Sequence, residues 1–309
     1  MTKPSHISNR IRTLLASLLL AGSLNLQADS SQADAEPTIE TSTPPITIIT
    51  WNIEWYPGKR RDAHDERAAE HAALVQRELA AMNPDILLAQ EIRDWQAFAD
   101  LCQAVPGLQP AVVSAFRSED SGEYWPQQIA IGSKLPVLAA WSEFWREGEI
   151  HPRRGFSAVA LQLPQTDQLL LVYSLHLKSN RSSTEEEEQL NFATRNESIR
   201  QLLKHIREME EIVFPGRILG VVVGGDFNTN QDGHFGDQVH NMMVEAGFYN
   251  TWGDTPRSRR QTWRGNFRFR PSTLDHIYVK GLGTPQAILL DPPEETSDHR
   301  PVKLILPLP

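Results

Sequence analysis

Cysteine is almost absent from this 309-residue sequence. Cys102 is the only one, so no disulfide can form within the chain. Disulfide-stabilised secreted scaffolds are therefore excluded as a class. We expect the stability of the protein to come from a hydrophobic core or from a bound metal.

Long hydrophobic runs are also missing. The longest run near the start, Thr13 to Leu24, follows Lys3, Arg10 and Arg12. It is too short to span a bilayer comfortably, and its charged, apolar and small-residue order is typical of a secretory signal. We predict a signal peptide at 1–28, export to the periplasm or the medium, and no transmembrane segment in the mature chain. A retained anchor or an amphipathic start is the alternative.

Basic residues are outnumbered, with 30 Lys and Arg against 39 Asp and Glu and a net charge of −9. The segment 1–28 holds three of the basic residues and no acidic one, so the remainder is more acidic still. A polyanionic substrate would be repelled by the protein as a whole, and we expect it to be captured by local basic groups.

Internal repeats and long flexible linkers are lacking after Pro45. Residues 29–45 are rich in Ser, Thr, Asp, Glu and Pro and read as a flexible leader, so 46–309 is expected to be one catalytic domain. Apolar runs predict strands and 3.6-residue periodicity predicts helices. The expected strands are at 46–51, 86–89, 128–133, 157–163, 169–177, 221–223, 274–279, 286–290 and 302–306, and the expected helices at 67–82, 185–212 and 237–246.

Several of these strands need both faces covered, which predicts an α/β fold with two packed sheets and outer helices. The helix at 185–212 starts with four glutamates, which the positive helix N-terminus favours. Its expected inner stripe is Leu190, Phe192, Ile199, Leu202, Leu203 and Ile206. The nearby aromatics Trp141, Phe144 and Trp145 have two interpretations, ordinary packing or a lipid-contacting edge.

Polar side chains stand at the boundaries of six predicted strands. The run Val221–Val223 stops at two glycines and presents Asp226 and Asn228, with Phe227 pointing to the opposite side. The other boundary residues are Asn52, Glu54, Glu91, His176, Asp275, Asp298 and His299. One such residue would mean little, because strand ends are solvated. Polar residues of this kind at six strand boundaries indicate a site.

Carboxylates without companion cysteines favour a hard cation, Mg²⁺, Mn²⁺ or Ca²⁺, over zinc. Histidines that do not bind metal can move protons or stabilise charge. Together these groups suit attack by water on a phosphoester, where charge builds on the phosphate oxygens.

Arginine and aromatic residues alternate in the segment 257–270, which includes Trp263, Arg264, Phe267 and Phe269. Arginine grips phosphate and aromatic rings accept bases, which indicates a nucleic-acid contact. The alternative is a solvated basic loop whose aromatics pack on the core. A second basic pair, Arg153 and Arg154, is interpreted either as a phosphate grip or as a surface pair.

The ordered motifs carry a resemblance to a known family. They are Thr50 to Trp55, Ala89-Gln90-Glu91, Tyr173 to Leu177, Gly224 to Asn228, Leu274 to Ile277 and Ser297 to Val302. Together they resemble the endonuclease/exonuclease/phosphatase superfamily, in an exported bacterial-type member. The resemblance implies the deoxyribonuclease I-like fold, a four-layer sandwich of two mixed sheets flanked by helices.

The resemblance also implies roles. Glu91 would be the principal metal ligand, with Asn52 and Asp298 as further ligands, and His299 the general base supported by Asp275. Asp226 and Asn228 would position the nucleophile and the phosphate, and His176 would bind phosphate or assist the leaving group. Arg154, Arg264 and Trp263 are expected to bind substrate. Glu54 is either a secondary site residue or a salt-bridge partner.

The function predicted from all of this is a metal-dependent exported nuclease, expected to be monomeric and to use Mg²⁺, Mn²⁺ or Ca²⁺. A phospholipid or small phosphate-ester hydrolase is the alternative within the class, since the catalytic set is shared. A non-catalytic binding module on the same fold is the alternative outside it, and the complete polar set argues against that.

Overall fold

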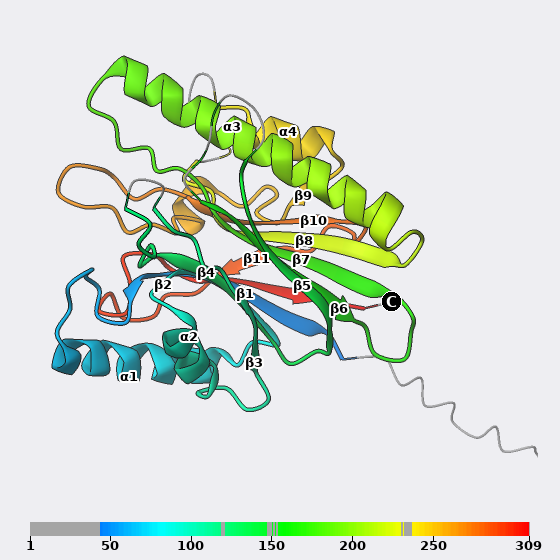
Figure 1. Ribbon diagram of the computed structural model, residues 1–309, viewed down its shortest axis with the longest axis horizontal. Coiled ribbons are helices and arrows are strands. Elements are labelled where there is room, and N and C mark those ends of the chain that lie inside the picture. The colour runs from blue at the N-terminus through cyan, green and yellow to red at the C-terminus, as the bar shows by residue number, and fades with distance from the viewer. Residues whose placement is uncertain are drawn as a thin grey trace, which may run out of the picture. The chain divides into compact units, whose positions relative to one another are not determined.

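Two six-stranded sheets pack face to face in the computed structural model of the chain (Figure 1). The structure describes residues 44–118, 121–146, 150, 152, 154–229, 231 and 237–308. The predicted signal peptide at 1–28 and all but the last two residues of the predicted leader at 29–45 lie outside the described residues. No helix in the described part is both long and apolar enough to cross a bilayer.

Each sheet is mixed, with a single parallel pair near its centre. The first sheet, in spatial order, consists of β11 (Ala287–Leu289), β12 (Val302–Leu306), β1 (Ile46–Tyr56), β2 (Ile86–Ile92), β4 (Gln128–Ser133) and β3 (Gln109–Val113). The second consists of β5 (Val137–Phe144), β6 (Gly155–Gln162), β7 (Leu169–His176), β8 (Ile218–Asp226), β10 (Asp275–Lys280) and β9 (Tyr249–Asn250). β1 runs parallel to β2 and β7 parallel to β8, and each pair is bridged by helical crossover segments that lie on the outer face of its sheet.

Helices cover the two outer faces. α1 (Asp65–Met82) and α2 (Trp95–Cys102) lie on the first sheet, and α3 (Glu185–Glu208) and α4 (Val239–Glu245) on the second (Figure 1). A π-helical turn, Met209–Val213, continues α3, and a 3₁₀ turn spans Arg257–Arg259. The helices and sheets form four layers, which confirms the predicted fold.

Three hydrophobic cores separate the four layers. Leu88, Val172 and Val222 belong to the core between the sheets. Trp51 and Leu79 belong to the core under α1 and α2. A third core lies under α3 and α4 and contains Phe227, Leu202 and Met243. Strands with apolar residues on both faces are needed to separate such cores, which is why their sequences are continuous apolar runs.

Most predicted elements are present, with shifted ends. β12 has the predicted bounds, while β1 runs five residues beyond the predicted end at 51. The sequence analysis missed α2, β3, β5 and β9. β5 has mostly exposed or half-exposed side chains, so no apolar run marked it, and α2 has only eight residues, too few for its periodicity to stand out.

The predicted inner stripe of α3 is correct except at one position. Phe192, Ile199 and Leu202 are buried, but Leu190 is 57% exposed. Leu190 lies in the solvated first turns, where Thr184 caps the helix and four glutamates follow. The predicted acidic helix start is confirmed.

The Trp141, Phe144 and Trp145 cluster is packed. Trp145 is buried against Phe156, and Trp141 contacts His205 and Phe214 edge to face. Ordinary packing is therefore the correct interpretation of this cluster.

Candidate active site

The polar residues predicted at strand boundaries gather at one end of both sheets. Asn52 lies on β1 and Glu91 near the end of the adjacent β2, in the first sheet. His176 and Asp226 are the last residues of the paired strands β7 and β8 and lie opposite each other. Asp275 begins β10 directly opposite Asp226. Because the two sheets face each other, side chains from both meet in one place.

Glycine makes the pairing of His176 with Asp226 possible. A Cβ atom at Gly225 would lie 2.1 Å from the carbonyl oxygen of Leu175, and its φ of +150° disfavours other residues. The two strands therefore approach as closely as they do because residue 225 has no side chain. The double glycine that ends the apolar run serves this approach.

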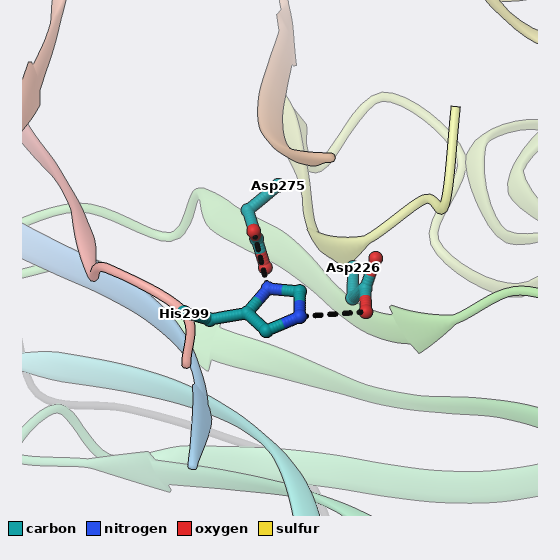
Figure 2. Close-up of side chains that lie close together, drawn as sticks. All are labelled: Asp226, Asp275 and His299. Carbon is teal, nitrogen blue, oxygen red and sulfur yellow. Dashed lines mark hydrogen bonds and ion pairs between the residues drawn. The ribbon is translucent and has the colours of Figure 1, made fainter. Parts of the chain in front are cut away.

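A group of three side chains, joined by one hydrogen bond and one longer ion-pair contact, forms the centre of the site (Figure 2). His299 Nδ1 lies 2.8 Å from Asp275 Oδ2, and His299 Nε2 lies 3.8 Å from Asp226 Oδ2. All three residues are buried. An ionised Asp275 accepts a hydrogen bond from Nδ1–H, which leaves Nε2 directed toward Asp226.

A second group lies around Asp226 and Glu91. Asn52 Nδ2 donates to Glu91 Oε1 at 3.3 Å and to Asp226 Oδ2 at 3.1 Å. His176 Nε2 lies 3.6 Å from Asp226 Oδ2 and 4.0 Å from Glu91 Oε1. Asp226 thus connects the two groups, and the amide of Asn52 and the ring of His176 bridge two carboxylates from different sheets.

Irregular backbone directs Glu91 into the site. The pairing of β2 shifts register between Gln90 and Ile92, so Glu91 is the extra residue of a bulge, with φ of +62°. Glu54, Trp55 and Asn228 also have positive φ. Such conformations are costly for residues other than glycine and concentrate at functional sites. The backbone N–H of Trp55 donates to Glu91 Oε2 at 3.0 Å and fixes that carboxylate.

Neighbouring groups hold His299 and Asp275 in place. Trp51 Nε1 donates to the His299 carbonyl oxygen, and Ser297 Oγ accepts from the His299 N–H while donating to the Asn52 carbonyl. Thr262 Oγ1 accepts from the backbone N–H of Asp275. Sequence reasoning did not select Trp51, Ser297 or Thr262, because a hydroxyl or an indole in a motif carries no sign of the atom it will meet.

Asp298 lies at the edge of the site, with its side chain 40% exposed. Its Oδ1 is 4.0 Å from His299 Nε2, and its Oδ2 accepts from Trp263 Nε1 at 3.0 Å. Glu54 accepts from the Asp298 backbone N–H and pairs with Lys59 at 3.0 Å. Glu54 therefore makes a salt bridge, as one of its two interpretations expected, and it also fixes the segment that carries Asp298.

The predicted substrate-binding arginines occupy different settings. Arg154 Nη2 donates to Gln127 at 2.8 Å. Burial lowers the pKa of Arg154, and the negative charges of Glu91 and Asp226 oppose this shift. Arg264 is held by Asp291 and by two backbone carbonyls. Arg153 lies outside the described residues.

Asn228 turns back toward the strands. Its Nδ2 donates to the carbonyl of Leu177 and its N–H donates to Asp226 Oδ1, so in this structure it orients Asp226. Phe227 points to the opposite side, as predicted, and is buried under α3 and α4.

Burial and neighbouring carboxylates together shift the pKa values of the central groups. Burial raises the pKa of Asp226 to about 7, and the nearby Asp275 adds to the rise while His299 opposes it. Burial opposes the charged form of His299, but Asp275 and Asp226 together hold its pKa well above the usual value. Burial therefore favours the protonated form of Asp226, and the neighbouring carboxylates favour the protonated form of His299.

A divalent cation fits this arrangement. One potential ligand atom from each of Asp226, Asp275 and His299 lies within 4.8 Å of the others, and Asp275 Oδ1 is buried with no hydrogen-bond partner. Glu91 and Asp298 add carboxylate oxygens nearby, and oxygen-rich sets of this kind suit Mg²⁺, Mn²⁺ or Ca²⁺. Asn52 presents its NH₂ group to the carboxylates, and its oxygen accepts from Glu54 N–H.

His176, which lies beside Glu91 and Asp226, is kept in its neutral form. Burial lowers the pKa of His176 well below its usual value, and the positive charges of Arg154 and His299 lower it further. His176 Nδ1 is buried without a hydrogen-bond partner. Its ring can thus offer a lone pair or an N–H without bringing a charge of its own.

The fold has two facing mixed sheets with outer helices, and its carboxylates and histidines gather at the strand ends. These features define a class of phosphoric ester hydrolases. The sequence matches the model of the Endonuclease/Exonuclease/phosphatase family over residues 49–299. The chain belongs to this family of metal-dependent phosphoesterases, as its motifs predicted. No curated protein matches the sequence significantly.

Solved structures share the fold at low sequence identity. SmcL is 16% identical with a TM-score of 0.64, and the match covers 85% of this chain and 99% of SmcL. The human Nocturnin catalytic domain with bound sulfate anion is 18% identical with a TM-score of 0.63, covering 85% and 94%. A mannosyl-6-phosphatase of Bacteroides thetaiotaomicron is 18% identical with a TM-score of 0.59, covering 84% and 98%.

Proposed function

We propose that this protein is an exported, metal-dependent nuclease that hydrolyses phosphodiester bonds of DNA or RNA. The observation that supports hydrolysis most directly is the orientation of His299. Its Nδ1 is committed to Asp275 at 2.8 Å, and its Nε2 faces the carboxylate-lined centre of the site. A ring held in this way is suited to take a proton from water.

In the proposed reaction, the neutral form of His299 accepts at Nε2 a proton from the attacking water, while Asp275 fixes the ring and stabilises the charge that it gains. Asp226, oriented by Asn228 and Asn52, positions the water. Arg154 and His176 contact the phosphate oxygens or the leaving oxygen. Glu91 and Asp298 would hold the cation, and Asn52, whose NH₂ group faces Glu91 and Asp226, would orient those carboxylates. The cation, when bound, would neutralise the charge that builds on the phosphate.

A nucleic-acid substrate is supported by the basic and aromatic segment beside the site. Trp263 and Arg264 hydrogen-bond to Asp298 through an indole nitrogen and a backbone nitrogen. Arginines and aromatic rings therefore lie next to the reacting groups, and these side-chain types bind phosphates and bases.

A small phosphate ester is the second candidate, because the related fold includes a mannosyl-6-phosphatase and the catalytic groups would serve either substrate. A substrate panel separates the candidates. Plasmid DNA, RNA, sphingomyelin, a sugar phosphate and a chromogenic phosphodiester are each incubated with Mg²⁺, Mn²⁺, Ca²⁺ or chelator.

The proposal predicts metal-dependent cleavage of DNA or RNA, with only slow turnover of the sugar phosphate. Activity confined to sphingomyelin or to the sugar phosphate would contradict it. Binding without hydrolysis of any substrate would favour the non-catalytic module. The proposed export has its own test, the size and location of the protein in cells that express the full sequence.

A further inference from the structure

A short hairpin projects from the site end of the fold (orange in Figure 1). Its base is formed by Trp263 and Ser272, whose backbones exchange hydrogen bonds of 2.9 and 3.1 Å. We refer to residues 263–272 as the Arg-Phe hairpin. Its sequence, Trp-Arg-Gly-Asn-Phe-Arg-Phe-Arg-Pro-Ser, alternates arginine with phenylalanine at the tip.

Hydrogen bonds within the hairpin give the tip a defined conformation. Asn266 Oδ1 accepts from the N–H groups of Arg268 and Phe269, and the Asn266 N–H donates to the Phe269 carbonyl. A Cβ atom at Gly265 would lie 2.7 Å from the Phe269 oxygen, and its φ is +79°. The turn is therefore built by Gly265 and Asn266, without any contribution from the phenylalanine rings.

The two phenylalanines of the tip are directed into solvent. Phe267 is 98% exposed and Phe269 is 58% exposed. Burying such rings would stabilise the fold by removing apolar surface from water, yet the fold leaves them exposed. For Phe267 and Phe269 the structure contradicts the interpretation in which the aromatics of this loop pack on the core, whereas Trp263 is half-buried. The two phenylalanine rings remain available to a ligand.

The tip carries positive charge on an acidic protein. Arg268 and Arg270 are exposed, and the Arg268 guanidinium lies 5.9 Å from the centre of the Phe267 ring. Among the described residues, neither arginine forms a salt bridge. The chain as a whole has a net charge of −9, so this tip attracts a polyanion that the rest of the surface repels.

The base of the hairpin is attached to the catalytic segment. Trp263 forms a β-bridge with His299 as well as with Ser272. The Arg264 N–H donates to the Asp298 carbonyl at 2.9 Å. Phe267 lies four positions after Trp263, so their Cα atoms lie at most about 14 Å apart. That upper limit corresponds to about four stacked nucleotides, so the tip is close enough to contact a strand bound at the site.

We infer that the Arg-Phe hairpin binds single-stranded nucleic acid, with unpaired bases stacking on its phenylalanines and phosphates contacting its exposed arginines. The inference rests on the proposed nuclease function, because it supplies the substrate class of that site. A duplex hides the faces of its bases, whereas a single strand exposes them to aromatic rings.

A lipid surface fits the tip less well. Membrane-interface anchors favour tryptophan and tyrosine, whereas the tip has two phenylalanines separated by arginine. Arg268 lies between them and Arg270 follows them, so charged residues interrupt the apolar sequence of the tip. Each phenylalanine of the tip is followed by an arginine. This alternation matches a nucleic-acid strand, in which phosphates and bases alternate.

The test measures binding and cleavage separately in the full protein. Phe267 and Phe269 are both changed to alanine, and the matched control changes the exposed Ile212 and Val213 on the turn after α3. Binding of a labelled single strand of about ten nucleotides, and of its duplex, is followed by fluorescence anisotropy in a His299→Ala background. Cleavage of the same strands and of a chromogenic phosphodiester is followed with His299 intact.

The hairpin variant is expected to bind the single strand at least about tenfold more weakly, with KM raised to match and kcat within about twofold. Duplex binding and turnover of the chromogenic ester should stay within about twofold of the parent. The Ile212 and Val213 variant should behave as the parent in every assay. Thermal unfolding checks that both variants are folded.

Unchanged single-strand binding in the hairpin variant overturns the inference, even if the protein is a nuclease. Equal losses for single strand and duplex also overturn it. Loss of binding to anionic phospholipid vesicles with normal binding to nucleic acid assigns the tip to a membrane instead. Conversely, hairpin-dependent binding by a protein that cleaves no nucleic acid supports the inference and contradicts the proposed function.

Discussion

His299 and Asp275 come from different halves of the sandwich, and their side chains meet at 2.8 Å. His299 precedes β12 of the first sheet, and Asp275 begins β10 of the second. The hydrogen bond therefore joins the two halves of the sandwich at the site. Any change in how the sheets pack at this end would alter the position of the proposed base.

Asp275→Asn tests the support that this carboxylate gives. The variant keeps the size of the side chain but removes the charge that fixes and stabilises the His299 ring, so we expect kcat to fall by about 10²-fold or more with little change in KM. Steady-state kinetics on a chromogenic phosphodiester measure this. Asp100→Asn, on an exposed face of α2, is the matched control and should retain full activity. A variant at position 275 with the parental kcat would remove Asp275 from the mechanism.

Glu91→Gln tests the predicted metal ligand. The amide can still accept from the Trp55 N–H but lacks the charge that attracts a cation, so the apparent metal affinity should fall by about tenfold or more. Metal titration of activity, together with calorimetry in the absence of substrate, gives the two affinities. Glu66→Gln, exposed in the first turn of α1, should leave both values unchanged. Equal metal affinity in the Glu91 variant and the parent would exclude Glu91 as a ligand.

His71→Ala tests a contact outside the chemistry. His71 is buried on α1, where Nδ1 accepts from the Gly58 N–H at 2.7 Å and Nε2 donates to the Thr296 carbonyl at 2.7 Å. It joins the segment after β1 to the segment that leads to Asp298. Removal leaves two buried backbone groups without partners, so the free energy of unfolding should fall by about 2 to 4 kcal/mol at pH 8, measured by urea titration.

The difference in stability between the parent protein and His71→Ala is expected to change with pH in one direction. Burial lowers the pKa of His71, while its hydrogen bond to Thr296 opposes the shift and the charges of Lys59 and Arg67 add to it. The neutral ring therefore contributes stability that is complete above the unfolded pKa of about 6.5. This stability is lost as the pH falls toward the lower folded pKa. The stability difference between the parent and His71→Ala should shrink from pH 8 to pH 5, and a difference that grows on acidification would contradict this role.

Much of the architecture follows from local patterns. Apolar runs such as Val221 to Val223 must be buried on both faces, and the positions of polar residues after them identify the site end. The four layers, and the convergence of Glu91, His176, Asp226, Asp275 and His299, could therefore be predicted from the sequence. What could not be predicted depends on tertiary contacts. β5 has no apolar run, and the position of Leu190 relative to solvent depends on where α3 leaves the sheet.

The details of the site also lie beyond sequence patterns. Glu91 reaches the centre because β2 bulges at that residue, and no propensity indicates a bulge at a glutamate. The exposure of Phe267 runs against the tendency of aromatic residues to be buried. Arg264 appeared suited to substrate from its neighbours in sequence, yet in the fold it binds Asp291 and two carbonyls. Its role in substrate binding stays a prediction.

The most direct measurement is the rate at which a His299→Ala protein hydrolyses a chromogenic phosphodiester and DNA or RNA with saturating Mg²⁺ or Mn²⁺. If His299 is the base, kcat should fall by about 10² to 10⁴-fold on each cleaved substrate, while the thermal midpoint stays close to that of the parent and metal still binds. Hydrolysis at a near-parental rate by this variant would contradict the account.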